Sequence, residues 1–119
     1  MSWYLTIRSD AHYSVFVATA SLVEFLVAMP DLRQTGPMSF QAAHGQPWVA
    51  VTLIACSPEG NYASEGVFLP RVNAVELVCS YDGDPGWYIA LAGRIAGFLG
   101  WSAFEDHEER QVWPPPELP

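Results

Sequence analysis

Three strand-like segments follow one another in the middle of this 119-residue chain, and their succession limits the fold more than any other feature. They are "PMSFQAA" (37–43), "WVAVTLIAC" (48–56) and "VNAVELVCS" (72–80). The third places Val75 and Leu77 on one side and Glu76 on the other, which is the period of a β-strand. Because parallel neighbours need long crossovers, strands joined by short links predict an antiparallel meander.

Two amphipathic helices are predicted to cover one face of this sheet. The first begins at a capping box formed by Ser21 and Glu24 and ends or kinks at Pro30, with Leu32 expected to extend its packing. The second has Asp84 as its N-cap, a proline at its first position, and Gly100 as its C-cap.

The remaining segments complete the predicted order. "SWYLTIRS" (2–9) alternates like a strand, "SPEGNYASEG" (57–66) is a polar loop, and "ERQVW" (109–113) is expected to form a short edge strand. The predicted fold is an α+β two-layer sandwich. Its four- to five-stranded, mainly antiparallel sheet carries two helices on one face, in the order β-α-β-β-β-α with a short final β. Residues 1–113 are expected to form one domain and residues 114–119 a proline-rich tail.

The charge balance selects between classes of partner. The chain has 13 acidic residues, no lysine and a formal net charge of −8. Its five cations are scattered: Arg8, Arg33, Arg71, Arg94 and Arg110. Phosphate recognition needs clustered cations, so we expect neither a nucleic acid partner nor an anionic membrane surface, and a partner protein with a basic surface is favoured. The alternative, that acidity only keeps a half-apolar chain in solution, stays open.

No sequence motif in the chain indicates a specific reaction. The histidines His12, His44 and His107 are far apart, and no metal-binding spacing of histidine and cysteine occurs. "DGDPG" (82–86) starts like a calcium loop, but Pro85 and Trp87 break that pattern, and a helix cap at Asp84 explains these residues better. We therefore predict no catalytic residue, no cofactor and no metal.

The cysteines and the N-terminus bear on the compartment. "MSWYLTIRSD" has no basic segment followed by an apolar run and a cleavage site, so we expect a cytoplasmic protein. Cys56 and Cys79 are then expected to be reduced and to behave as small apolar residues. The sequence leaves open whether they face each other on neighbouring strands.

The stretch "WSAFEDHEERQVWPPPELP" (101–119) is the sharpest local clue. We expect Trp101 and Phe104 to pin it to the domain, whereas Trp3 and Trp48 belong to the core. Carboxylates and tryptophans near the second helix and this stretch suit a recognition surface, because tryptophan is enriched among residues that dominate binding energy. The predicted partner-binding residues are Asp82, Asp84, Trp87, Glu105, Asp106, Glu108, Glu109 and Trp113. The competing interpretation is a solvated tail.

In size, charge, layout and its C-terminal third, "GDPGWYIALAGRIAGFLGWSAFEDHEERQVWP" (83–114), the chain resembles the small acidic immunity proteins that accompany secreted polymorphic toxins of bacteria. These toxins include effectors of the type VI secretion and Rhs kind. The resemblance implies a non-enzymatic protein that binds its cognate toxin and covers or distorts the toxin's active site. An acidic surface suits a toxin whose site is basic because it handles nucleic acid, nucleotide or NAD. No residue role is carried over from the resemblance.

Two other classes of function remain open. One is a different binding module, such as an adaptor or a subunit of an assembly. The other is a small enzyme or ligand-binding domain, which would show a concave pocket with convergent polar groups.

Overall fold

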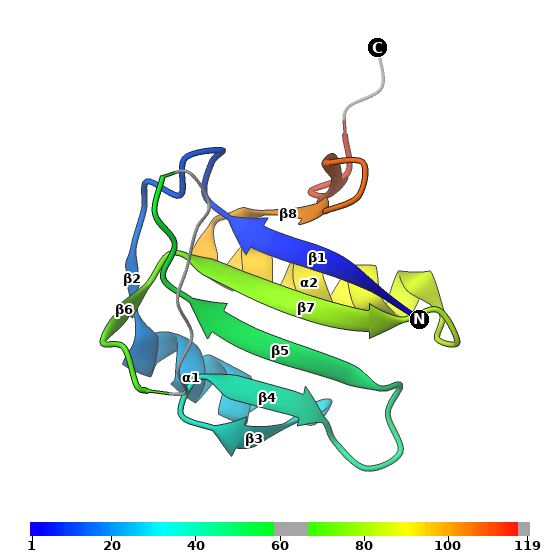
Figure 1. The fold of residues 1–119 in the computed structure, drawn as a ribbon. Coiled ribbons are helices and arrows are strands. Elements are labelled where there is room, and N and C mark those ends of the chain that lie inside the picture. The colour runs from blue at the N-terminus through cyan, green and yellow to red at the C-terminus, as the bar shows by residue number, and fades with distance from the viewer. Residues whose placement is uncertain (59–66, 117–119) are drawn as a thin grey trace.

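The computed structural model describes residues 1–58 and 67–116, which form an antiparallel sheet and two helices (Figure 1). The helices are α1 (Thr19–Val27) and α2 (Pro85–Leu99). The strands are β1 (Ser2–Arg8), β2 (Val17–Ala18), β3 (Leu32–Gly36), β4 (Ser39–Ala42), β5 (Val49–Ile54), β6 (Arg71–Val72), β7 (Ala74–Ser80), β8 (Ser102–Glu105) and β9 (Arg110–Trp113). The α+β class expected from the sequence is confirmed.

Seven strands of the described part of the chain form one sheet in the order β3-β4-β5-β7-β1-β8-β9, and β2 pairs with β6 in a separate ribbon. Neighbouring strands in both sheets are antiparallel. The sheet is therefore larger than the four to five strands expected from the sequence. The difference lies in β3 and β8, two short strands whose partners make them part of the sheet.

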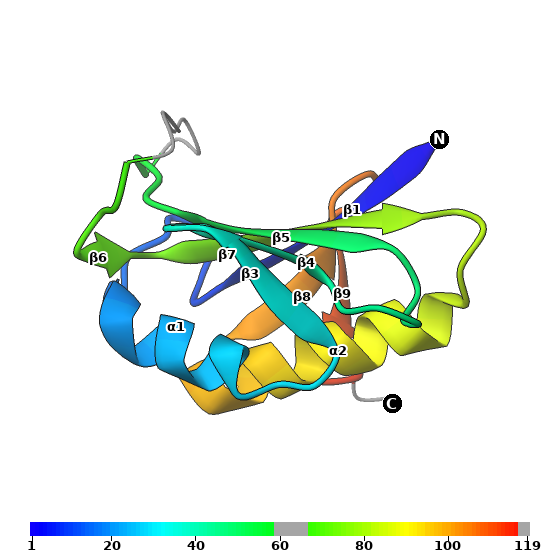
Figure 2. The ribbon, with the colours of Figure 1, turned by 90° about the horizontal axis from the view of Figure 1, so that it is seen from below.

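Both helices lie on the same side of the sheet (Figure 2). The strand residues on that side are fully buried, as Leu5 and Ile7 of β1 and Leu77 of β7 illustrate. Leu26 of α1 and Leu91 of α2 are buried against the same core. We call this side the covered face. The other side has no helix over it in the described residues, and we call it the open face.

Helix α1 starts differently from the sequence prediction. Its N-cap is Ala18, which makes no side-chain cap hydrogen bond, and Ser21 lies inside the helix, so the predicted capping box is wrong. Thr19 instead fixes the start, because its backbone N–H donates to the Pro70 carbonyl at 3.0 Å and its hydroxyl donates to the Leu69 carbonyl at 2.5 Å. Tertiary contacts thus replace a local cap.

The chain after Pro30 also departs from the prediction. Leu32 begins β3 and is not part of α1, but it is buried in the same core cluster as Leu22 and Leu26 of that helix. It is buried at 6% exposure and lies opposite Ala42 of β4. The predicted strand 37–43 is confirmed as β4, where Phe40 is fully buried.

Helix α2 follows the sequence signals. The Asp84 carboxylate accepts from the Gly86 N–H at 3.0 Å, and Pro85 occupies the first helical position. Gly100 closes the helix with a left-handed backbone, φ 73°, and its N–H reaches the Ala96 carbonyl. The helix is therefore capped at both ends by residues read directly from the sequence.

The segment after α2 returns to the sheet as a hairpin. Trp101 is buried at 5% exposure, as expected, and β8 then pairs with β1 while β9 forms the predicted edge strand. Trp113, the last residue of β9, lies on α2 at Gly93, where an added Cβ would meet Cδ1 of the indole at 2.6 Å. A glycine in the helix makes room for this ring.

The two cysteines are free and do not face each other. Cys79 pairs across β7 and β5 with Val49, whereas Cys56 lies beyond Ile54 at the opposite end of β5. Most of the loop predicted at 57–66 lies outside the described residues. Within the described residues, neither helix has the length and apolar character needed to cross a membrane.

Candidate functional site

The fold brings two acidic segments to the same end of the sheet. β7 ends at Ser80 opposite Ser2 of β1, and Glu105 of β8 lies opposite Leu5 of the same strand. The connection from β7 to α2 and the turn from β8 to β9 therefore flank the first half of β1 (Figure 1). We call the carboxylates of these segments the acidic end. They are Asp82, Asp84, Glu105, Asp106, Glu108 and Glu109.

Shallow pockets join the two segments. One of about 340 Å³ has Tyr4, Tyr81 and Asp106 in its lining, and a second of about 240 Å³ has Trp3, Tyr81 and Glu105. Because Tyr81 lines both pockets, its ring connects the turn at 105–109 with the connection that carries the two aspartates. Glu105 and Asp106 thus lie on one surface with Tyr81, the residue that precedes Asp82.

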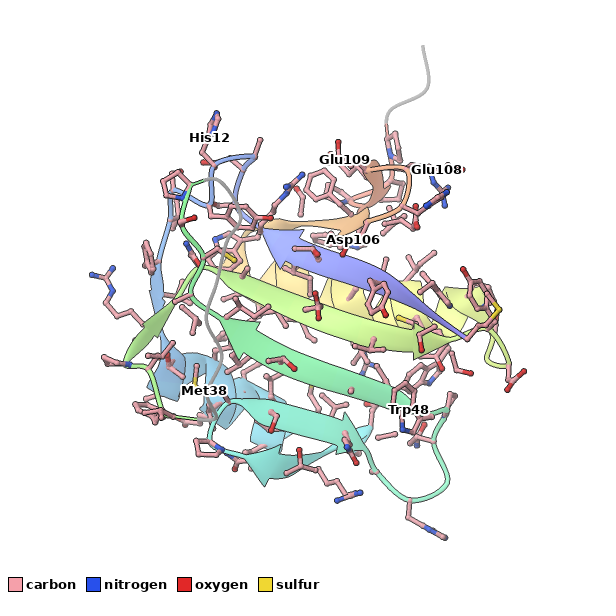
Figure 3. The ribbon with its side chains drawn as sticks, viewed as in Figure 1. His12, Met38, Trp48, Asp106, Glu108 and Glu109 are labelled. Carbon is pink, nitrogen blue, oxygen red and sulfur yellow. The ribbon has the colours of Figure 1, made fainter. Side chains whose placement is uncertain are left out.

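Exposed aromatic rings stand among these carboxylates. Tyr4 is 43% exposed and Tyr81 is 63% exposed. Trp48 is 49% exposed and, with Asp82 and Asp84, lines a third pocket of about 480 Å³. The expectation that Trp48 belongs to the core is therefore wrong, because it precedes β5 and lies at the end of the sheet (Figure 3). Rings of this kind can bury a large area at low entropic cost.

The turn between β8 and β9 is held by one of its own carboxylates. Glu105 accepts from the N–H of His107 at 3.0 Å and from that of Glu108 at 2.9 Å. These bonds, above all the one from Glu108, hold the pKa of the Glu105 carboxyl below its usual range. Glu105 is thus a structural residue of the turn, and Glu108 and Glu109 are exposed on it (Figure 3).

Asp106 is attached to β1. Its N–H donates to the Tyr4 carbonyl at 3.1 Å, and its carboxylate accepts from the Thr6 hydroxyl at 2.7 Å. The side chain remains exposed, but its partial desolvation beside β1 raises the pKa of its carboxyl. The negative charges of Glu105 and Glu109 act in the same direction.

Besides Glu105 and Asp106, three more of the predicted partner-binding side chains make contacts within the fold. Asp84 caps α2, as described above. Trp87 is half-buried with its ring edge-on to Tyr88 at 5.2 Å between centroids, and Trp113 lies against Gly93. A partner role for these residues remains a prediction, and any such role would be combined with a structural one.

The acidic end has few internal counter-charges. The ion pair found within residues 1–58 and 67–116 joins Arg94 to Asp31 at 3.0 Å, and none of the six carboxylates forms one. Arg110 lies opposite Glu105 across β8 and β9 and contributes to lowering its pKa. Most of the negative charge is therefore available to a partner.

This geometry offers little support for acid–base catalysis or for a metal site. Over the described residues, no group of three His, Cys, Asp or Glu side chains is arranged to hold a metal ion. The sequence predicts the acidic residues of this surface but not the exposure of Tyr4 and Tyr81, since Tyr4 is exposed because it alternates with the buried Leu5 on β1 and Tyr81 because it follows the end of β7. The tyrosine beside "DGD" was the available signal.

No family model, curated protein or solved structure matches the chain, so its function must be argued from its own geometry.

Proposed function

We propose that this protein is a non-enzymatic, cytoplasmic binding protein whose acidic end docks on the basic surface of a partner protein. The observation that carries the proposal is the placement of three exposed rings, Tyr4, Trp48 and Tyr81, among six carboxylates at one end of the sheet. Acidic residues alone would serve solubility. Aromatic rings held among them supply contact area that solubility does not need.

The two kinds of residue would contribute at different stages of binding. The unpaired carboxylates raise the rate of encounter with a basic surface, an effect that salt weakens. The rings then lower the rate of dissociation, because they are buried at the centre of the contact. Glu108 and Glu109, exposed on the turn, belong to the first stage, and Tyr81, which lines two of the pockets, belongs to the second.

We propose further that the partner is a secreted bacterial toxin and that the bound protein covers the toxin's active site. The support is the resemblance to small immunity proteins together with the charge. A toxin that handles nucleic acid, nucleotide or NAD needs a basic site, and an acidic end with exposed rings complements such a site. An adaptor or assembly subunit would use the same surface without neutralising its partner.

The test is co-expression of the protein with a toxin encoded by a neighbouring gene, read out as growth and as a one-to-one complex. Glu108→Lys should lower the association rate and its salt dependence, and Glu24→Lys, the same change at an exposed site on α1, should not. Tyr81→Ala should weaken the complex by about tenfold or more, whereas Phe68→Ala at another exposed ring should not.

Each result has a distinct meaning. A complex that forms without restoring growth would replace the immunity function by that of an adaptor. A complex that tolerates both Glu108→Lys and Tyr81→Ala would show that the acidic end is not the interface. Absence of both complex and rescue with every neighbouring gene product would reject the immunity function.

A further inference from the structure

A separate pocket lies on the open face, where β1 pairs with β8. It has a volume of about 170 Å³, well below the roughly 300–1,000 Å³ of sites for drug-sized ligands. Thr6 of β1 and Phe104 of β8 face each other across its floor. We call it the Arg8 pocket; it is lined by Thr6, Arg8, Tyr13, Phe104, Asp106 and Glu109.

The guanidinium of Arg8 is held in this pocket by aromatic rings. Its Cζ lies 4.4 Å from the centroid of the Phe104 ring and 5.6 Å from that of Tyr13. Its Nε is buried and has no hydrogen-bond partner, and no carboxylate of the described residues forms an ion pair with Arg8. Cation–π contacts hold such a group in place but leave its hydrogen-bond donors unsatisfied. The buried Nε of Arg8 thus lacks an acceptor, although the charge of Arg8 acts on the nearby carboxylate of Asp106.

The wall that carries Tyr13 is fixed by a network of hydrogen bonds. The Asp10 carboxylate accepts from the N–H of His12 at 2.8 Å and from the N–H of Ser14 at 3.2 Å. The Tyr13 carbonyl accepts from the side chain of Asn73, which is fully buried, at 3.0 Å. The loop therefore holds its ring beside Arg8 before any ligand arrives, which lowers the entropic cost of binding.

The opposite wall is the turn between β8 and β9, which the Glu105 carboxylate holds as described above. In the described part of the chain, the residues other than glycine with positive φ are Tyr13, at 55°, and Glu109, at 51°, and both line this pocket. Backbone conformations of this kind are uncommon and concentrate at sites that bind ligands. Two strained residues in one small pocket favour a binding role over a purely structural one.

The charges of the lining decide the class of ligand. A simple anion would meet Arg8 but would be repelled by Asp106 and Glu109, and a simple cation would leave Arg8 without an acceptor. A molecule with a carboxylate and an ammonium group satisfies both kinds of residue. Since the two carboxylates outnumber the one cation, a further positive charge on the ligand is also accommodated.

We propose that the Arg8 pocket binds a free α-amino acid, with preference for one whose side chain is cationic. The ligand carboxylate pairs with the guanidinium of Arg8, and its α-ammonium group faces Asp106 and Glu109. The rings of Tyr13 and Phe104 bound the pocket and limit the size of ligand. The Arg8 pocket shares Asp106 and Glu109 with the acidic end, but it holds its ligand through Arg8, which is not part of the acidic end.

The test is titration of the ¹⁵N-labelled protein with L-arginine, followed by NMR. The backbone amides of Thr6, Phe104 and Asp106 and the Nε–H signal of Arg8 should shift and saturate with a dissociation constant on the order of 1 mM or tighter. Agmatine, which lacks the carboxylate, and L-glutamate, whose extra charge is negative, should each bind about tenfold more weakly or worse.

Variants separate the pocket from general attraction of cations to an acidic protein. Arg8→Met keeps the alkyl stem against the rings and should lower the affinity for L-arginine by about tenfold or more, whereas Arg33→Met on β3 should leave it unchanged. Should Arg8→Met fail to fold, Glu109→Gln, at an exposed residue, should give a several-fold loss that Glu24→Gln does not. Equal shifts with agmatine, or shifts spread over the whole acidic end, would overturn the proposal.

Discussion

The two faces of the sheet carry opposite kinds of side chain on neighbouring residues of the same strands. Across four adjacent strands, the residues in register on the covered face are Phe40, Val51, Leu77 and Leu5. One residue further along, the open face presents Ser39, Thr52, Glu76 and Thr6. The first set is fully buried and the second is half-buried. The covered face thus supplies stability, and the open face leaves polar groups within reach of ligands.

The largest expected effect contrasts two neighbours in β7. Leu77 on the covered face is fully buried, so Leu77→Ala should lower the free energy of unfolding by about 2–5 kcal/mol through lost burial and the resulting cavity. Val78 on the open face is only half-buried, and Val78→Ala should cost about 1 kcal/mol or less. Urea unfolding of both variants measures the difference. Similar losses for the two would mean that something in solution covers the open face.

The second prediction tests whether the packing on the covered face extends to β9, the last strand. An alanine Cβ at Gly93 would lie 2.6 Å from Cδ1 of Trp113, so Gly93→Ala should displace this ring and lower the free energy of unfolding by about 1–3 kcal/mol. At Gly97 the nearest indole atom would be 3.4 Å away, and Gly97→Ala should be neutral or stabilise the helix by up to about 1 kcal/mol.

Urea unfolding and the indole N–H signal of Trp113 report on both glycine variants. If Gly93→Ala leaves stability and this signal unchanged, Trp113 is not held on α2, and it becomes available to a partner. That outcome would mean that Trp113 belongs to the recognition surface and not to the packing on α2.

Alternation was enough to predict that Val75 and Leu77 of β7 share one face, and a two-layer fold must bury one side of each strand. The ends of α2 were also predictable, since Asp84 and Gly100 act through local backbone geometry. The start of α1 was not, because Thr19 is fixed by the carbonyls of Leu69 and Pro70, which are distant in sequence. Local sequence patterns thus predicted the features that depend on neighbouring residues, such as the ends of α2.

The candidate sites show the same division. The sequence predicts the carboxylates at 105–109 but not the strand β8, because its pairing with β1 joins Thr6 to Phe104, nearly the whole chain apart. The Arg8 pocket depends on that pairing and on the loop that holds Tyr13. Neither the exposure of Trp48 nor the lack of an ion pair at Arg8 in the described residues follows from a pattern of neighbouring residues.

The smallest effect concerns Glu76, a half-buried carboxylate near the middle of the open face, opposite Thr6 and Thr52. Burial, and secondarily the charge of Asp106, raises the pKa of its carboxyl in the folded protein. The native state therefore holds this proton more tightly than the unfolded chain, whose glutamate pKa is about 4.3. The resulting stabilisation is present below the unfolded pKa and is lost as pH rises through the folded pKa.

Glu76→Gln cannot lose a proton, so it should be more stable than the wild type at neutral pH, by about 1 kcal/mol or less, with the advantage disappearing near pH 3. Glu24→Gln on α1 is the control and should show no such trend. Urea unfolding at both pH values measures the difference. If Glu76→Gln were instead less stable at neutral pH, the carboxylate would be making a favourable contact, and the open face would contribute to folding as the covered face does. If the gain is found, the open face holds a charge that weakens the fold.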